Sequence, residues 1–108
     1  MAESHPSDFH KIATVSELPA EGEAKSFACG ARMICVARIN GDLAALDDVC
    51  PHRGGPLGAG IVEGTHIVCP WHGWEFEAHT GKSVLVPDVT IDTFELKIEG
   101  EDVLARKR

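Results

Sequence analysis

The sequence lacks the features that mark several large classes of protein. It contains no run of about 18 apolar residues, so we expect no membrane-spanning helix. Residues 1–6 offer neither the basic region nor the apolar stretch of a secretion signal, and we expect a soluble, cytoplasmic protein. Lys and Arg number 10 against 17 Asp and Glu, for a formal net charge of −7. This balance argues against nucleic-acid binding through a basic face and suits transient docking to positively charged partners.

The sequence also lacks long helical periodicity and internal repeats, which favours a nearly all-β chain. At 108 residues, it is long enough to bury a core without disulfide support. We expect a single domain over residues 1–108. Asn40 followed by Gly41 is the strongest hairpin signal. The segments expected to form strands are 9–15, 24–28, Arg32–Ile39, 43–46, Ile61–Glu63, His66–Val68, 74–78, 83–86, 90–99 and 102–106.

Two short motifs combine sulfur and nitrogen ligands: Cys50 with His52, and Cys69 with His72. A single zinc ion would also accept two thiolates and two imidazoles, although zinc motifs more often pair Cys with Cys and His with His. A binuclear [2Fe-2S] cluster fits the mixture well, because one iron can take both thiolates and the other both imidazoles. We therefore expect these four residues to bind one [2Fe-2S] cluster per chain, with a structural zinc site as the alternative.

With this ligand pattern the chain resembles the Rieske-type [2Fe-2S] ferredoxins. The likeness includes residues 53–57 after the first motif and residues 73–76 after the second, and it extends over roughly the whole chain. It implies an all-β Rieske fold, in which a small cluster-binding subdomain, roughly residues 47–78, sits on a β-barrel or sandwich base. Both ligand loops are then expected at one end of the molecule.

The resemblance also implies how the cluster is held. Cys50 and Cys69 would bind the inner iron, and His52 and His72 the outer, more exposed one. Electrons would cross at the His52/His72 tip, which is expected to be flanked by Pro56, Leu57 and Trp71.

By function, the chain is similar to the ferredoxin component of a multicomponent, aromatic-ring oxygenase system. Such a protein carries one electron at a time from a flavin-dependent NAD(P)H reductase to a terminal oxygenase, and it turns over no substrate itself. The roughly 36 residues after His72 read as strands, so we expect no catalytic domain with a mononuclear iron. The runner-up is the small subunit of an assimilatory NAD(P)H nitrite reductase, which has the same fold.

Imidazole ligation raises the potential of such a cluster above that of plant-type ferredoxins. High-potential respiratory members of the family add hydroxyl donors from a serine and a tyrosine, at the positions of Trp74 and Phe76, and this chain contains no tyrosine. We therefore expect a potential nearer roughly −150 mV than +300 mV. Those members also join their loops by a disulfide at the positions of Gly55 and Trp71, which this sequence cannot form.

The remaining candidates are given structural roles. Cys29 and Cys35 lie in apolar, strand-like surroundings and are expected to be buried free thiols. Trp71, between two ligands, is expected to shield the cluster or to border a docking surface, whereas Arg53 is treated as ordinary exposed surface. Surface or packing roles are expected for the other histidines, which are His5, His10, His66 and His79. Four glycines, Gly54, Gly55, Gly58 and Gly60, are expected to provide the backbone φ freedom that lets amides approach the cluster closely.

Overall fold

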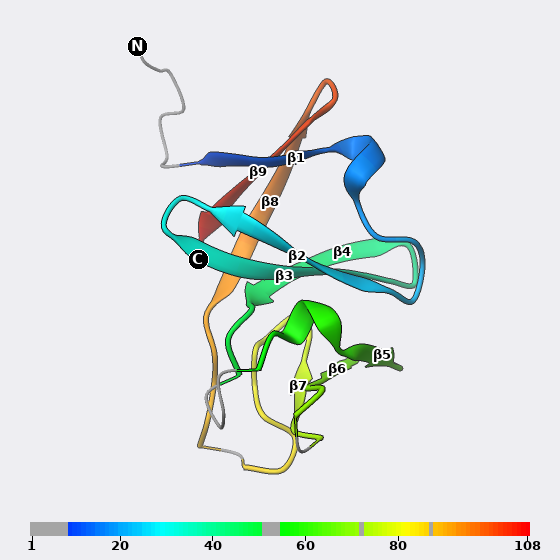
Figure 1. Ribbon diagram of the computed structural model, residues 1–108, viewed down its shortest axis with the longest axis vertical. Helices are drawn as coiled ribbons and strands as arrows, with labels where there is room; N and C mark the ends of the chain where they lie inside the picture. The colour runs from blue at the N-terminus through cyan, green and yellow to red at the C-terminus, as the bar shows by residue number, and fades with distance from the viewer. Residues whose placement is uncertain (1–8, 51–54, 72, 87) are drawn as a thin grey trace.

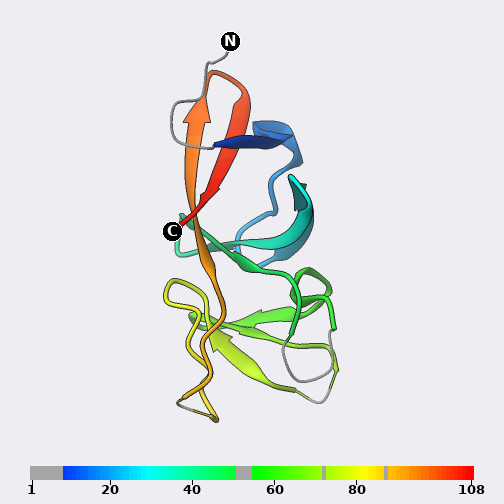
Figure 2. The ribbon, with the colours of Figure 1, turned by 90° about the vertical axis from the view of Figure 1, so that its left-hand side faces the viewer.

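The computed structural model describes residues 9–50, 55–71, 73–86 and 88–108 (Figure 1). Strands account for most of the described chain, and its helices are two single 3-10 turns, η1 (Val15–Glu17) and η2 (Leu57–Ala59). The expected all-β fold is therefore confirmed. Two antiparallel sheets, one of six strands and one of three, are stacked along the long axis of the molecule (Figure 2).

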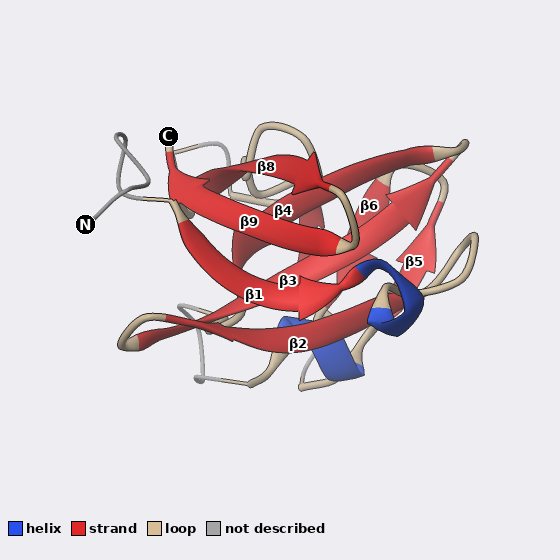
Figure 3. Cartoon of the chain, turned by 90° about the horizontal axis from the view of Figure 1, so that it is seen from above, coloured by secondary structure: helices blue, strands red, loops and turns tan. Residues whose placement is uncertain are grey.

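The larger sheet forms the base of the molecule. The strands at the two ends of its order, β1 and β2, also contact each other, so the sheet curls into a barrel-like shape (Figure 3). A tight turn with positive φ at Asn40 and Gly41 joins β3 to β4, as the hairpin signal predicts. In spatial order the strands are β1 (His10–Thr14), β9 (Asp102–Lys107), β8 (Thr93–Glu99), β4 (Asp42–Asp47), β3 (Arg32–Ile39) and β2 (Ala24–Cys29).

The smaller sheet contains β5 (Ile61–Glu63), β6 (His66–Val68) and β7 (Glu75–Glu77). Figure 1 shows η2 between this sheet and the base. A hydrophobic core joins the two parts, because it contains fully buried side chains from both. From the base come residues such as Leu46, and from the smaller part Cys50, Leu57, Ile67, Cys69 and Phe76.

Most strand predictions agree with the structure to within a few residues, but residues 83–86 do not form a strand. Ser83 makes only an isolated bridge to Phe76, and its hydroxyl accepts a hydrogen bond from the amide of Val86 at 3.1 Å. This side chain to backbone bond closes a local turn instead of continuing a ladder. The following strand begins at Thr93, not at residue 90.

Among the described residues, no helix is long and apolar enough to cross a membrane.

Two glycines with positive φ provide a test of close packing. A Cβ atom at Gly81 (φ +77°) would lie 2.2 Å from the carbonyl oxygen of Ile91, whereas one at Gly100 (φ +62°) would meet no atom within 4 Å. We expect Gly81→Ala to lower the free energy of unfolding by about 3 kcal/mol, from backbone strain and overpacking together. Gly100→Ala, with strain alone, should cost about 1 kcal/mol. Denaturant unfolding of both variants measures the difference, and equal losses would contradict the packing argument.

Candidate metal centre

The first candidate ligand loop closes directly after the base sheet. Past the end of β4, the amide of Leu57 donates to the carbonyl oxygen of Asp48 at 2.7 Å, and the amide of Cys50 donates to that of Gly55 at 2.9 Å. Val49 and Pro56 form an antiparallel bridge between these two bonds. The root of the loop is thus a short, hydrogen-bonded hairpin, and Cys50 is buried in it.

The second loop is closed in a similar way at the end of β6. Cys69 donates its amide to the carbonyl oxygen of Trp74 at 2.6 Å, and Gly73 adopts a φ of +72°, which favours glycine. Within the loop, the amide of Trp71 donates to Cys69 Sγ at 3.4 Å. A backbone N–H directed at this sulfur stabilises negative charge on it, as a thiolate ligand requires.

These loops bring two thiols together from distant parts of the sequence. Cys50 is 0% exposed and Cys69 is 1% exposed, and both side chains belong to the same buried hydrophobic core. Burial raises the pKa of the Cys69 thiol, the Trp71 amide opposes that rise, and the neighbouring Cys50 adds to it. A metal cation would offset the cost of deprotonating such a pair, since thiolate is the form that binds metal.

The other two predicted ligands, His52 and His72, lie outside the described residues, as do Arg53, Gly54 and His5. Within the described residues, no group of three or more His, Cys, Asp or Glu side chains is arranged to hold a metal ion. Only two of the four candidate ligands, Cys50 and Cys69, are among the described residues, so this site falls short of three. The buried, unbridged thiol pair, together with an imidazole supplied near each thiol by the sequence, fits the [2Fe-2S] donor set.

The residues expected around the tip differ in exposure. Pro56 is exposed and Trp71 is 50% exposed, whereas Leu57, which is also expected to flank the tip, is fully buried. Leu57 points into the core that contains both candidate cysteines. A Cβ atom at Gly55 would lie 2.9 Å from Trp71 Cγ and 3.2 Å from Cys69 Sγ. Gly55 therefore lets the two loops approach each other closely.

The role expected for the other glycines needs correction. Gly58 and Gly60 are not among the residues with positive φ, so conformational freedom does not explain them. Added Cβ atoms would lie 2.1 Å from Ser26 Oγ at Gly58 and 2.0 Å from the Val68 carbonyl oxygen at Gly60. Both positions require glycine because neighbouring backbone passes too close for a side chain.

The described cysteines and histidines that are given no ligand role lie as expected. Cys29 and Cys35 are buried and free, and Cys35 is fully buried in the same core as the thiol pair. His66 lies 3.2 Å from Glu75 through its Nδ1 atom, and both side chains are about one-third exposed. His10 and His79 are exposed. None of these side chains joins Cys50 and Cys69 in a metal-binding group among the described residues.

Cys35 provides a test of how tightly this core is closed. Burial, reinforced by the negative charge of Asp48, raises the pKa of its thiol, so very little thiolate forms at neutral pH. We expect iodoacetamide to label Cys35 at pH 8 at least on the order of a hundredfold more slowly than it labels free cysteine. Because the pKa is raised, the rate should keep rising with pH after that of free cysteine has levelled off. Peptide mapping by mass spectrometry measures the rate at Cys35, and labelling at the rate of free cysteine would contradict the burial.

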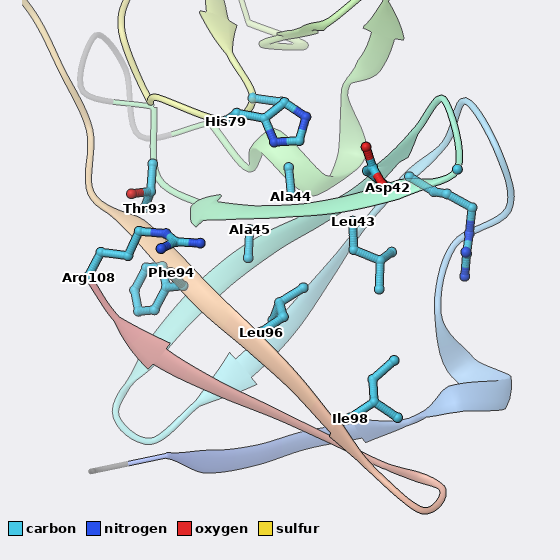
Figure 4. Close-up of a pocket in the computed structure, with 13 residues that line it drawn as sticks. Asp42, Leu43, Ala44, Ala45, His79, Thr93, Phe94, Leu96, Ile98 and Arg108 are labelled. Atoms are coloured by element: carbon cyan, nitrogen blue, oxygen red, sulfur yellow. The ribbon is translucent and has the colours of Figure 1, made fainter.

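A groove of about 470 Å³ lies elsewhere, on the face of β4 and β8 (Figure 4). Its lining is mixed, with apolar residues such as Leu43 and Leu96 beside the polar residues Asp42, His79 and Arg108. Neither Cys50 nor Cys69 lines it. The groove is therefore not the candidate centre.

Comparison with known proteins agrees with this geometry. The family model described as "Rieske [2Fe-2S] domain" matches residues 8–95. The chain is 34% identical to human apoptosis-inducing factor 3 over 79% of its own length, but spans only 14% of that protein. It is 36% identical to the ferredoxin component of biphenyl 2,3-dioxygenase from Rhodococcus jostii (strain RHA1), covering 87% of this chain and 88% of that one. A solved structure titled as a complex of reduced oxygenase and oxidized ferredoxin in carbazole 1,9a-dioxygenase contains a similar chain, with a TM-score of 0.79, 26% identity and coverage of 93% and 95%.

Proposed function

The chain belongs to the Rieske [2Fe-2S] domain family, and from that premise we propose that it is a one-electron carrier, the ferredoxin component of a multicomponent oxygenase system. Membership of the family gives it one [2Fe-2S] cluster. Like the ferredoxin components that it resembles over most of their length, it is an electron-transfer component and not a catalytic subunit. The observation that supports the proposal best is the buried pair of thiols, Cys50 and Cys69, held by two loops in a chain that matches 88% of a dioxygenase ferredoxin component.

We propose Cys50 and Cys69 as ligands of the inner iron, and His52 and His72 as ligands of the outer one. We also propose that residues 1–108 form a single domain and that roughly residues 47–78 form its cluster-binding part. When bound, the cluster would accept one electron and release it again. The chain would bury the thiolate side of the cluster in its core, and the Trp71 amide would support the Cys69 sulfur.

The proposed partners are a flavin-dependent NAD(P)H reductase, as electron donor, and a terminal oxygenase, as acceptor, both met transiently in the cytoplasm. The formal charge of −7 suits weak, steered docking to positively charged surfaces. Two exposed apolar side chains offer contact area to a partner: Trp71 in the second loop, 50% exposed, and Leu85 after β7, 67% exposed. The complex named in the carbazole dioxygenase structure supports the oxygenase as acceptor.

Metal analysis and spectroscopy of protein purified without air test the cofactor. We expect iron and sulfide in equal amounts. The dithionite-reduced protein should give an electron paramagnetic resonance (EPR) spectrum whose average g value lies below that of an all-cysteine cluster. Zinc without sulfide, in a colourless protein, would point to the structural zinc site instead.

The reduction potential is expected near roughly −150 mV, at the low end of the Rieske range. Phe76 is fully buried and has no polar atom, so this position supplies no hydroxyl to the cluster sulfurs. Trp74 packs against the same core, 6.3 Å from Phe76 between ring centroids. Redox titration monitored by visible absorbance measures the potential, and a value near +300 mV would contradict this argument.

Reconstitution of electron flow tests the function itself. An oxygenase reductase with NADH should reduce the protein, and a terminal oxygenase should reoxidise it, with oxygenase turnover depending on the chain. The runner-up, a small subunit of nitrite reductase, requires a different partner. Stable association with a sirohaem-containing reductase, and no transfer to an oxygenase, would favour that alternative.

A further inference from the structure

Asp48 is the one charged side chain that is buried among the described residues, with 4% of its surface exposed. It stands at the end of β4, two residues before the candidate ligand Cys50. A carboxylate out of contact with water is costly unless it is well hydrogen-bonded. The role of Asp48 can therefore be inferred from its hydrogen-bond partners.

Those partners come from two other elements. Asp48 Oδ1 accepts a hydrogen bond from Ser26 Oγ at 2.9 Å and another from the backbone amide of Gly58 at 2.7 Å, and Oδ2 lies 3.0 Å from the same hydroxyl. Ser26 belongs to β2 in the base sheet, and Gly58 is the central residue of η2. We call this group of Ser26, Asp48 and Gly58 the Asp48 junction.

The Asp48 junction holds η2 directly against the base. A Cβ atom at Gly58 would lie 2.1 Å from Ser26 Oγ and 2.5 Å from the Ser26 amide nitrogen, so the two backbones are nearly in contact. The backbone of Asp48 takes part as well, because its carbonyl oxygen accepts the amide of Leu57 at 2.7 Å, at the root of the first ligand loop.

The other end of η2 reaches the second ligand loop. Gly60 follows η2, and a Cβ atom there would lie 2.0 Å from the carbonyl oxygen of Val68, the residue before Cys69. Between the two ends, the fully buried Leu57 packs in the core that contains Cys50 and Cys69. A displacement of η2 would therefore move the roots of both loops relative to each other.

We propose that Asp48 is a positioning residue for the cluster: its carboxylate fixes η2 on β2, and η2 in turn sets the spacing of the two ligand loops. The inference rests on the proposed function, since it assumes that these loops hold a cluster. The carboxylate acts here as a double hydrogen-bond acceptor. Its oxygens would act on the cluster indirectly, through the backbone of η2 to which they are hydrogen-bonded.

The test measures how fast the assembled protein loses its cluster to a chelator, followed by bleaching of the visible absorbance. Asp48→Ala is expected to lose the cluster about tenfold faster than wild type, as is usual when a residue that orients metal ligands is removed. Asp48→Asn retains an acceptor oxygen for both partners and should stay within about threefold of wild type. Ser26→Ala, a change at an exposed side chain, removes one donor and should accelerate loss by about threefold.

Two control variants separate positioning from stability and from charge. Val103→Ala truncates a fully buried side chain in β9 and so lowers stability without touching the Asp48 junction. The rate of cluster loss is measured for each variant at the same number of degrees below its own melting temperature, and the rates are then compared. Asp102→Asn removes the same charge from a half-exposed side chain of β9, which pairs with Lys11 of β1 at 3.2 Å. We expect both controls to lose the cluster at the wild-type rate, and the EPR g values of the reduced protein to shift in Asp48→Ala only.

Three results would overturn the proposal while leaving the proposed function intact: cluster loss in Asp48→Ala at the rate of Val103→Ala, equal acceleration in Asp48→Asn and Asp48→Ala, or an Asp48→Ala spectrum identical to that of wild type. If Asp48→Ala does not fold, Ser26→Ala decides, and a wild-type rate in that variant overturns the proposal. Wild-type protein without iron and sulfide would instead overturn the proposed function, and the role of Asp48 with it.

Discussion

Cys69→Ala is expected to yield a folded protein that binds less than about a tenth of the wild-type iron, because the cluster would then keep only three of its four proposed ligands. Cys50→Ala should behave in the same way. Both thiols are at most 1% exposed, so water cannot easily take the vacant position. Iron and sulfide analysis of protein purified without air, together with the visible spectrum, measures the loss.

Cys35→Ala is the matched control for this experiment. Cys35 is a fully buried, free cysteine in the same hydrophobic core as Cys50 and Cys69, and the same atoms are removed from it. We expect a loss of about 1 kcal/mol in the free energy of unfolding, from the small cavity, with iron and sulfide unchanged. Full iron content in Cys69→Ala, or equal loss of iron in Cys35→Ala, would show that the thiol pair is not the cluster site.

The parts of the fold that could be predicted are those specified by local signals. Arg32–Ile39, Ile61–Glu63 and His66–Val68 have the predicted bounds, because apolar and β-branched residues are followed within two positions by Asn-Gly, Gly or Pro. The segment 83–86 contains an equally apolar run, yet Val84 and Leu85 are exposed and a serine hydroxyl closes a turn there. Composition alone could not tell a strand from a turn closed by its own side chain.

The candidate site also has some features that the sequence predicts and others that it does not. Ligand types and spacing are local in the sequence, so the four candidate ligands could be proposed from it, and the structure buries two of them, Cys50 and Cys69, in one core. The Asp48 junction could not be predicted, since Ser26 and Asp48 are 22 residues apart and nothing near either residue indicates the other. The glycines show the same limit: sequence reasoning gives Gly58 conformational freedom, whereas its actual requirement is a backbone 2.5 Å from where a Cβ atom would stand.

His72→Cys is expected either to lose the cluster or to lower its reduction potential by on the order of 100 mV, since a third thiolate moves the centre part of the way towards the plant-type value near −400 mV. The reason is formal charge. With two thiolates and two neutral imidazoles, the oxidised centre is neutral and one electron makes it singly negative. A third thiolate makes the oxidised centre negative before the electron arrives, and adding an electron to a charged, partly buried group is harder.

The shift is measured by redox titration of the variant beside wild type, and the average g value of the reduced protein should rise towards that of an all-cysteine cluster. His66→Cys is the matched control, because it introduces the same side chain at the histidine nearest to the ligand motifs in sequence. His66 pairs with Glu75 in the smaller sheet, so this change should leave the potential within roughly 10 mV of wild type and the g values unchanged. An intact cluster at the wild-type potential in His72→Cys would show that this imidazole is not a ligand, and the charge argument for a raised potential would then fail with it.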